Sequence, residues 1–160
     1  MKVRIVAAGT KMPDWVLQPC RDYLRRIPGE CQVLLSEVPL ERRSKAQSTA
    51  VVKRRETMRL LEAVPRGDYL VALDERGQSI STTQLADRLQ RWQMDGRDIS
   101  LLIGGPDGLD FDVIAATQQW PDWRWSLSGL TLPHPLVRIF LVEQLYRACS
   151  INSGHPYHRQ

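Results

Sequence analysis

The sequence predicts an α/β fold, a mostly parallel sheet flanked by helices, in one domain over residues 1–160. Strand-like and helix-like segments alternate along the chain, which favours parallel strands joined by helical crossovers. Two strand-like runs, residues 69–73 and 99–103, are apolar along nearly their whole length, as in strands that helices cover on both faces. With 160 residues, 42% of them hydrophobic, the chain can bury one core without disulfide or metal staples.

The first half of the chain predicts two strands, each followed by a helix. Residues 3–8 form a β-favouring run, and apolar residues at helical spacing predict a helix over 14–27, stopped by Pro28-Gly29. Residues 31–38 predict the second strand. Residues 49–64 predict the second helix, which ends at Pro65-Arg66-Gly67.

The second half continues the alternation. Residues 69–73 predict a strand closed by a turn at 74–77, and residues 82–94 a helix capped by Ser81 or Thr82. Residues 99–103 predict a strand ending in Gly104-Gly105-Pro106-Asp107-Gly108. A weaker helix over 111–119, a short strand over 123–127 and a strongly hydrophobic helix over 136–151 complete the pattern.

Ligands of such sheets bind at loops that leave the carboxyl ends of the strands. Three loops meet this description: after Leu73, at Gly104-Gly105, and over 127–132. The second loop has neither the GxGxxG spacing nor a P-loop lysine, so taken alone it is also compatible with a plain tight turn. The third has few ionisable groups. It suits a flat ring such as adenine held by backbone groups and leucines, or a buried loop that caps the last helix.

Composition bounds the cellular setting. Cys20, Cys31 and Cys149 are odd in number and form no CxxC pair, so we expect reduced core residues in a cytoplasmic protein. We expect no metal site, no signal peptide and no membrane span, because apolar runs are only a few residues long.

Positive charge is concentrated between residues 41 and 59. That segment has a net charge of +5, which leaves about −1 for the remainder of a chain with net charge +4. Its cations are Arg42, Arg43, Lys45, Lys53, Arg54, Arg55 and Arg59. The pattern suits a polyanion contact on one face, and it is equally compatible with a solvated helix.

The histidines all lie in the last thirty residues. His134 stands between two prolines, which favours a structural role or a helix cap. His155 and His158 flank Pro156-Tyr157, close to Arg147 and Arg159, a group that suits an anion or a base better than a metal. A tail that contacts nothing is the alternative.

Several of these motifs together closely resemble the RlmH family, over essentially the whole chain. The motifs are residues 102–108 (LIGGPDG), 126–134 (SLSGLTLPH), 143–148 (EQLYRA) and 156–159 (PYHR), with Ala8-Gly9-Thr10-Lys11 and Tyr23-Leu24-Arg25-Arg26. The departures are a small insertion over 119–124 and Gly129, which stands at a variable position.

The resemblance implies a SPOUT-class methyltransferase with a C-terminal trefoil knot. It also implies a homodimer, S-adenosyl-L-methionine as cofactor, and N3-methylation of a pseudouridine in helix 69 of 23S rRNA within the assembled ribosome. Implied cofactor residues are Leu73, Gly104, Leu127, Ser128, Gly129, Leu130, Thr131 and Leu132. Implied residues for catalysis are Arg147, Tyr157 and His158, and Arg159 is implied for RNA contact.

Catalysis would then rest on positioning and on electrostatic stabilisation of an imide anion. In the basic segment, Arg42, Arg43, Arg54 and Arg55 would hold rRNA phosphates. Two alternatives are a non-catalytic ribosome- or RNA-binding module and a knotted methyltransferase that acts on tRNA. A nucleotide-dependent oxidoreductase is disfavoured because the GxGxxG motif is absent.

Overall fold

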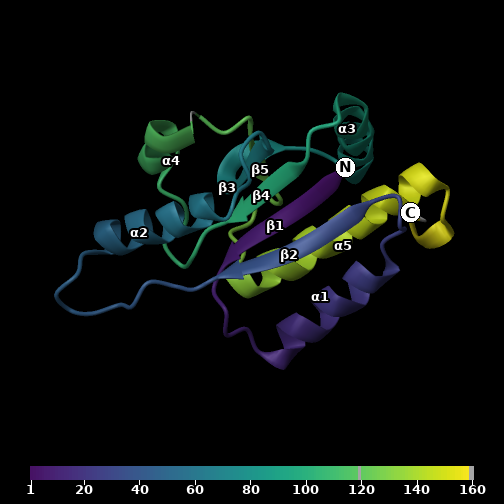
Figure 1. Cartoon of the computed structure of the whole chain (residues 1–160). Helices are drawn as coiled ribbons and strands as arrows, with labels where there is room; N and C mark the ends of the chain where they lie inside the picture. Colours follow the sequence, from purple (N-terminus) through teal and green to yellow (C-terminus); the bar gives the residue numbers. More distant parts are fainter. Residues whose placement is uncertain (119, 159–160) are drawn as a thin grey trace.

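One parallel sheet organises the structure, a computed structural model that describes residues 1–118 and 120–158. The described strands pair in the order β2-β1-β4-β3-β5 (Figure 1). They are β1 (Lys2–Ala8), β2 (Gln32–Val38), β3 (Tyr69–Ser79), β4 (Ile99–Ile103) and β5 (Trp123–Ser126). The α/β fold class and the parallel sheet predicted from the sequence are confirmed.

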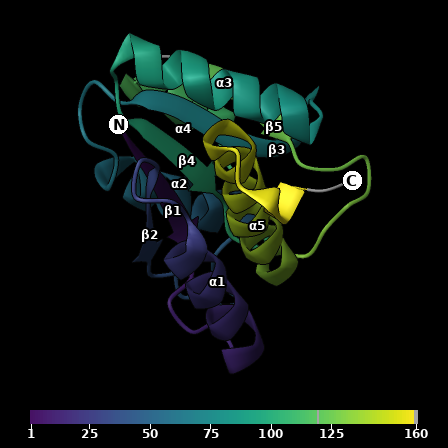
Figure 2. The same cartoon turned by 90° about the vertical axis from the view of Figure 1, so that its right-hand side faces the viewer.

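Helices cover both faces of the sheet. They are α1 (Asp14–Arg26), α2 (Thr49–Glu62), α3 (Thr82–Asp95), α4 (Phe111–Gln118) and α5 (His134–Ser153), followed by the short 3₁₀ helix η1 (Pro156–His158). On one face α5 lies between α1 and α3, while α2 and α4 cover the other (Figure 2). No helix in the described part of the chain is long and apolar enough to cross a membrane.

The two faces of β1 explain its continuous apolar sequence. Val3, Ile5 and Ala7 pack into the core beneath α1, α3 and α5, whereas Val6 and Ala8 pack into the core beneath α2 and α4. Strand β4 is buried at every residue for the same reason. Strands β1, β3 and β4 each contribute to two cores, so alternation of polar and apolar residues is absent from their buried segments.

Strand β3 is longer than predicted. The sequence predicts a turn after Leu73, but pairing with β5 resumes at Gln78, and both Leu73 and Gln78 lie opposite Trp125. Residues 74–77, the β3 bulge, leave the ladder and return to it. Gly77 fits there because a Cβ atom would lie 2.7 Å from the backbone of Arg124.

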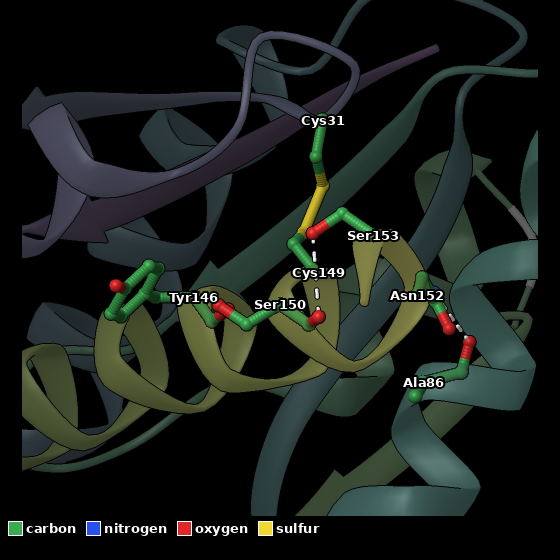
Figure 3. Close-up of a disulfide and its surroundings, with 7 residues drawn as sticks. All are labelled: Cys31, Ala86, Tyr146, Cys149, Ser150, Asn152 and Ser153. Carbon is green, nitrogen blue, oxygen red and sulfur yellow. Dashed lines mark hydrogen bonds between the residues drawn. A yellow bond between two sulfur atoms is a disulfide. The ribbon is translucent and has the colours of Figure 1, made fainter. Parts of the chain in front are cut away.

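The expectation of unpaired cysteines is wrong for two of the three. Cys31, just before β2, and Cys149, near the end of α5, form a disulfide (Figure 3). Their Cα atoms are 6.4 Å apart, although 118 residues separate them in sequence, so no local spacing signals the pair. Cys20 remains a free buried thiol, and burial raises its pKa.

Candidate active site

A cavity of about 790 Å³ opens at the carboxyl ends of β3, β4 and β5. Its walls come from the three loops that the strand-end rule selects: the β3 bulge, the β4–α4 loop and the β5–α5 loop. The predicted cofactor residues that line it are Leu73, Gly104, Leu127, Ser128, Leu130, Thr131 and Leu132. Gly129 belongs to the β5–α5 loop and does not line the cavity. The volume of the cavity is typical of sites for small organic ligands.

Glycines shape the β4–α4 loop by close approach of backbone. A Cβ atom on Gly104 would lie 2.6 Å from the carbonyl carbon of Gly108, and one on Gly105 would lie 2.6 Å from Glu56 Oε1. The Gly108 amide donates to the Gly105 carbonyl at 2.9 Å, with Gly108 at φ +82°. The loop is therefore both the tight turn and the cavity wall that the sequence left as alternatives.

Short polar contacts hold the β5–α5 loop. Ser126 Oγ donates to the Ser128 carbonyl at 2.8 Å, and Ser128 Oγ accepts from the Leu130 amide at 2.9 Å. Thr131 donates to Glu75 of the β3 bulge at 3.1 Å, so two walls of the cavity are joined. Among the described residues, no group of three His, Cys, Asp or Glu is placed to hold a metal ion.

His134, at the start of α5, supports the β4–α4 loop from the side of the helix. Its Nε2 accepts from Arg138 Nε at 2.9 Å, and its Nδ1 lies 2.7 Å from the Gly104 carbonyl. An arginine only donates, so Nε2 carries no proton and Nδ1 donates to Gly104. Burial, together with the charge of Arg138, lowers the pKa of His134. These contacts agree with the structural role favoured by the sequence, and His134 also lines the cavity.

Arg138 is a buried cation that sequence reasoning missed, with 1% of its surface exposed. Besides His134, it donates to Glu37 of β2 and to the carbonyls of Ala8 and Gly9 after β1. Its signal in the sequence is a single charge inside the apolar run 136–142 of the last predicted helix. Buried charges require such complete pairing.

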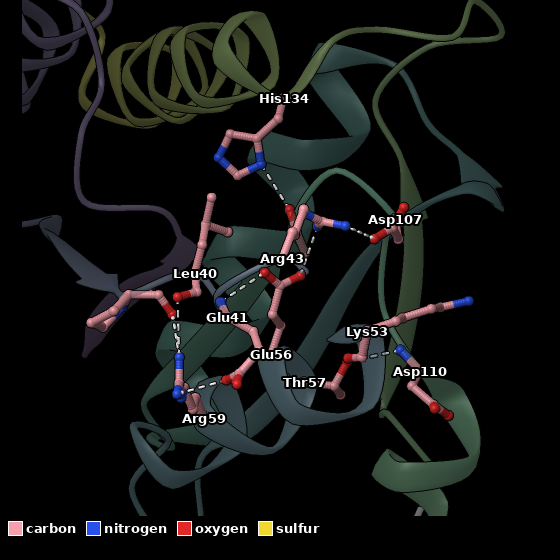
Figure 4. A network of polar contacts seen from close by, with 12 residues as sticks. Leu40, Glu41, Arg43, Lys53, Glu56, Thr57, Arg59, Asp107, Asp110 and His134 are labelled. Atoms are coloured by element: carbon pink, nitrogen blue, oxygen red, sulfur yellow. Dashed lines mark hydrogen bonds and ion pairs between the residues drawn. The ribbon is translucent and has the colours of Figure 1, made fainter. Parts of the chain in front are cut away.

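The basic segment divides into paired and exposed cations. Arg43 contacts Asp107 of the β4–α4 loop and Glu56 of α2 (Figure 4). Arg55 and Arg59 pair with Glu41. Arg42 and Arg54 are exposed and make no ion pair with another described residue. Of the predicted phosphate contacts, these two have the least competition from the protein's own carboxylates.

The C-terminal candidates form a second cluster around Glu143. Arg147 Nε donates to Glu143 Oε1 at 2.8 Å, and the Tyr157 hydroxyl donates to the same oxygen at 3.1 Å. The Arg147 guanidinium lies 4.8 Å from the centre of the Tyr157 ring, which packs on Tyr146. Sequence reasoning did not select Glu143, although its spacing of four residues from Arg147 is a helical ion-pair signal.

Electrostatics keep both members of this cluster in their ordinary protonation states. Burial, the hydrogen bond with Tyr23 and the charge of Glu143 raise the pKa of Tyr157. Burial opposes the charge of Arg147, but the hydrogen bond to Glu143 and the Coulomb interactions with Glu143, Tyr157 and Tyr23 together outweigh it and raise the pKa of Arg147. His158 belongs to η1, while its side chain and residue Arg159 lie outside what the structure describes.

The cavity and the C-terminal cluster lie at opposite ends of α5. His134 begins the helix beside the cavity, and Arg147 follows thirteen residues later, about 20 Å along the axis at 1.5 Å per residue. The structure brings the predicted cofactor residues together, and it brings Arg147 and Tyr157 together. It does not bring the two groups to one place within a single chain.

Comparisons with known proteins agree along the whole chain. A sequence model of the family described as "Predicted SPOUT methyltransferase" matches residues 1–158. A protein of Methylobacillus flagellatus named ribosomal RNA large subunit methyltransferase H is 48% identical over 160 residues, covering 100% of both chains. The protein with that name in Hydrogenovibrio crunogenus is 45% identical with the same coverage.

Proposed function

Since the chain belongs to the SPOUT methyltransferase family, we propose that it methylates N3 of a pseudouridine in helix 69 of 23S rRNA, with S-adenosylmethionine as donor. The observation that carries the proposal is the convergence of residues from three distant loops on one cavity. The names of both relatives support a large-subunit rRNA substrate. The proposal includes the trefoil knot of the family and a cytoplasmic location, where assembled ribosomes are found.

The cavity fits a donor with a flat ring and charged groups of both signs. Leu127, Leu130 and Leu132 line one wall, which suits the faces of an adenine, while loop backbone can pair with its edge. Asp74, Glu75 and Asp107 line the other walls together with the cations Lys53, Arg76 and Arg124, so groups of both signs are available for the sulfonium and the carboxylate of the donor. When bound, S-adenosylmethionine would supply an electrophilic methyl group on its sulfonium.

The acceptor requires the removal of one proton. N3 of the base carries a weakly acidic imide hydrogen, which must leave before the nitrogen attacks the methyl carbon. Arg147 would stabilise the imide anion electrostatically. Tyr157, whose raised pKa keeps its hydroxyl protonated, would orient the base, and His158 would accept the proton near neutral pH. Glu143 would hold Arg147 and Tyr157 in register.

A homodimer would unite the two halves of this site. Because Arg147 lies about 15 Å along α5 from Val137, which lines the cavity of its own chain, we propose that it serves the cavity of the other protomer. Trp15 on α1 and Phe140 on α5 are 56% and 43% exposed on the sheet face that these helices share, an apolar surface available for pairing.

The test of function is methylation of ribosomes from a strain that lacks this protein, with the modified nucleotide mapped by mass spectrometry. The expected product is one N3-methylated pseudouridine in helix 69. Methylated tRNA would favour the tRNA alternative. Ribosome binding without heat of binding from S-adenosylhomocysteine would favour the non-catalytic module.

Mixed dimers test the shared site. Thr131→Trp fills the cavity mouth, and Arg147→Ala removes the anion-stabilising group, so each variant alone should be inactive. If the site is shared between protomers, an equal mixture regains about a quarter of the wild-type sites through heterodimers. A mixture as inactive as its parents would contradict the shared site.

A further inference from the structure

The segment between β2 and α2 is attached to the wall of the cavity through Arg43. One guanidinium nitrogen donates to Asp107 Oδ2 of the β4–α4 loop at 2.5 Å. Another lies 3.5 Å from Glu56 Oε1 of α2 (Figure 4). The hydrogen bond to Asp107 is the main cause that raises the pKa of Arg43. One arginine thus joins three parts of the chain.

Glu56 shows that this attachment is built into the fold. Its side chain is only 1% exposed, and a carboxylate at that depth requires partners. The backbone amide of Glu41 donates to its Oε2 at 3.1 Å, and Arg43 faces its Oε1. Both partners come from the segment 39–48, while Gly105 of the cavity wall packs against the same carboxylate. Glu56 therefore lies between the basic segment and the cavity wall.

Arg42 and Arg43 are neighbours in sequence with different surroundings. Arg42 is exposed, whereas the charge of Arg43 is opposed by Asp107 and Glu56. Asp107 lines the cavity, so whatever orders Arg43 also orders the loop against which the donor would lie. Arg43 therefore differs in kind from the phosphate contact that the sequence predicts.

We propose that Arg43 is a positioning residue that couples RNA binding on the segment 39–48 to donor binding in the cavity. The inference rests on the proposed function. RNA that contacts Arg42 would hold this segment in one conformation. Through its contact with Asp107, Arg43 would then hold the β4–α4 loop in one conformation as well. Both ligands then favour the same arrangement, so each tightens the binding of the other by the same factor.

The test measures the Kd of S-adenosylhomocysteine for the dimeric protein by calorimetry or equilibrium dialysis. The measurement is made on the protein alone and again in the presence of a saturating concentration of ribosomes, with no S-adenosylmethionine added. In the wild type we expect ribosomes to lower the Kd for this ligand about fivefold, the lower end of typical coupling. In Arg43→Ala, ribosomes should leave that Kd unchanged, and the Kd of the protein alone should rise. Arg43→Lys, which keeps the charge, should restore part of the coupling.

Matched variants separate coupling from a loss of charge. Arg42→Ala should weaken ribosome binding and retain the coupling, because its side chain makes no contact with Asp107. Asp107→Asn should lose the coupling as Arg43→Ala does, and the double variant should be no worse than either single variant.

Two results would overturn the inference: wild-type coupling in both Arg43→Ala and Asp107→Asn, or an equal loss of coupling in Arg42→Ala. A wild-type protein that binds no S-adenosylhomocysteine would instead contradict the proposed function, so the two failures are distinguishable. Arg43 is 42% exposed, and circular dichroism checks that its replacement leaves the fold intact.

Discussion

Replacing Arg138 by methionine tests how much stability the buried guanidinium provides. Methionine fills a similar volume, but it removes four hydrogen bonds, to His134, Glu37, Ala8 and Gly9. Removing one partner of a buried ion pair costs about 3–5 kcal/mol. Glu37 is 29% exposed, so water replaces part of its lost contact, and we expect a loss near the lower end, about 3 kcal/mol. For a chain of this size that lowers Tm by about 6–12 °C.

Equilibrium unfolding in urea, followed by far-UV circular dichroism, measures this loss. Arg25→Met is the matched control, because Arg25 is 74% exposed and pairs with Asp22 on the surface of α1, so its replacement should change stability by less than about 0.5 kcal/mol. The charge of Arg138 also helps to lower the pKa of His134, so the variant should raise that pKa in an NMR titration. A stability loss below about 1 kcal/mol would refute the reasoning, because the buried groups that lose their partner should each destabilise the fold by at least that much.

Three further predictions concern pH, redox state and RNA affinity. Burial lowers the pKa of His134 in the native state, so as pH falls the unfolded chain binds a proton at this residue before the native chain does. The free energy of unfolding should therefore fall as pH drops below about 6.5, which urea midpoints at pH 7 and pH 5 measure. The same pH dependence in His134→Gln would assign the effect to other groups. Reduction with dithiothreitol should lower Tm, since the disulfide closes a loop of 118 residues, which stabilises the fold by at most about 5 kcal/mol. Cys31→Ser should have the Tm of the reduced protein, and dithiothreitol should not change it. An unchanged wild-type Tm on reduction would argue against a stabilising bond. Arg54→Glu should weaken ribosome binding and reduce the slope of log K against log salt concentration by about 1 or more; an unchanged slope in filter-binding titrations would leave Arg54 as solvated surface.

The alternation of strands and helices could be predicted because the central strands β1, β3 and β4 each contribute residues to two cores. That requirement leaves long apolar runs such as β4, and the intervening helices carry apolar residues at helical spacing. The β3 bulge could not be predicted, because polar residues at 74–77 have the composition of a turn and only pairing with β5 returns the chain to the sheet. The Cys31–Cys149 pair was missed because a contact across 118 residues leaves no local pattern.

The candidate site was predictable as far as backbone topology determines it. Parallel strands end at one edge, so the loops after Leu73, Ile103 and Ser126 had to meet there. Side-chain direction was not predictable. No pattern in the basic segment distinguishes Arg42 from Arg43, because only the folded structure shows that Asp107 and Glu56 lie beside Arg43. The distance between Arg147 and the cavity, by contrast, follows from the single helix predicted over 136–151, which α5 confirms.

The β3 bulge also bears on how the cavity can diversify. The pairs that precede it end at Leu73 opposite Trp125, and the pairs that follow it begin at Gln78 opposite the same residue. Apart from Gly77, which must stay small beside the Arg124 backbone, the register of the sheet on either side therefore does not depend on the residues that lie between. Residues 74–76 line the cavity, so this wall can change in length and charge while the strands that carry it keep their pairing. The paired residues of β3 must therefore stay constant, whereas residues 74–76 can change to suit a different ligand.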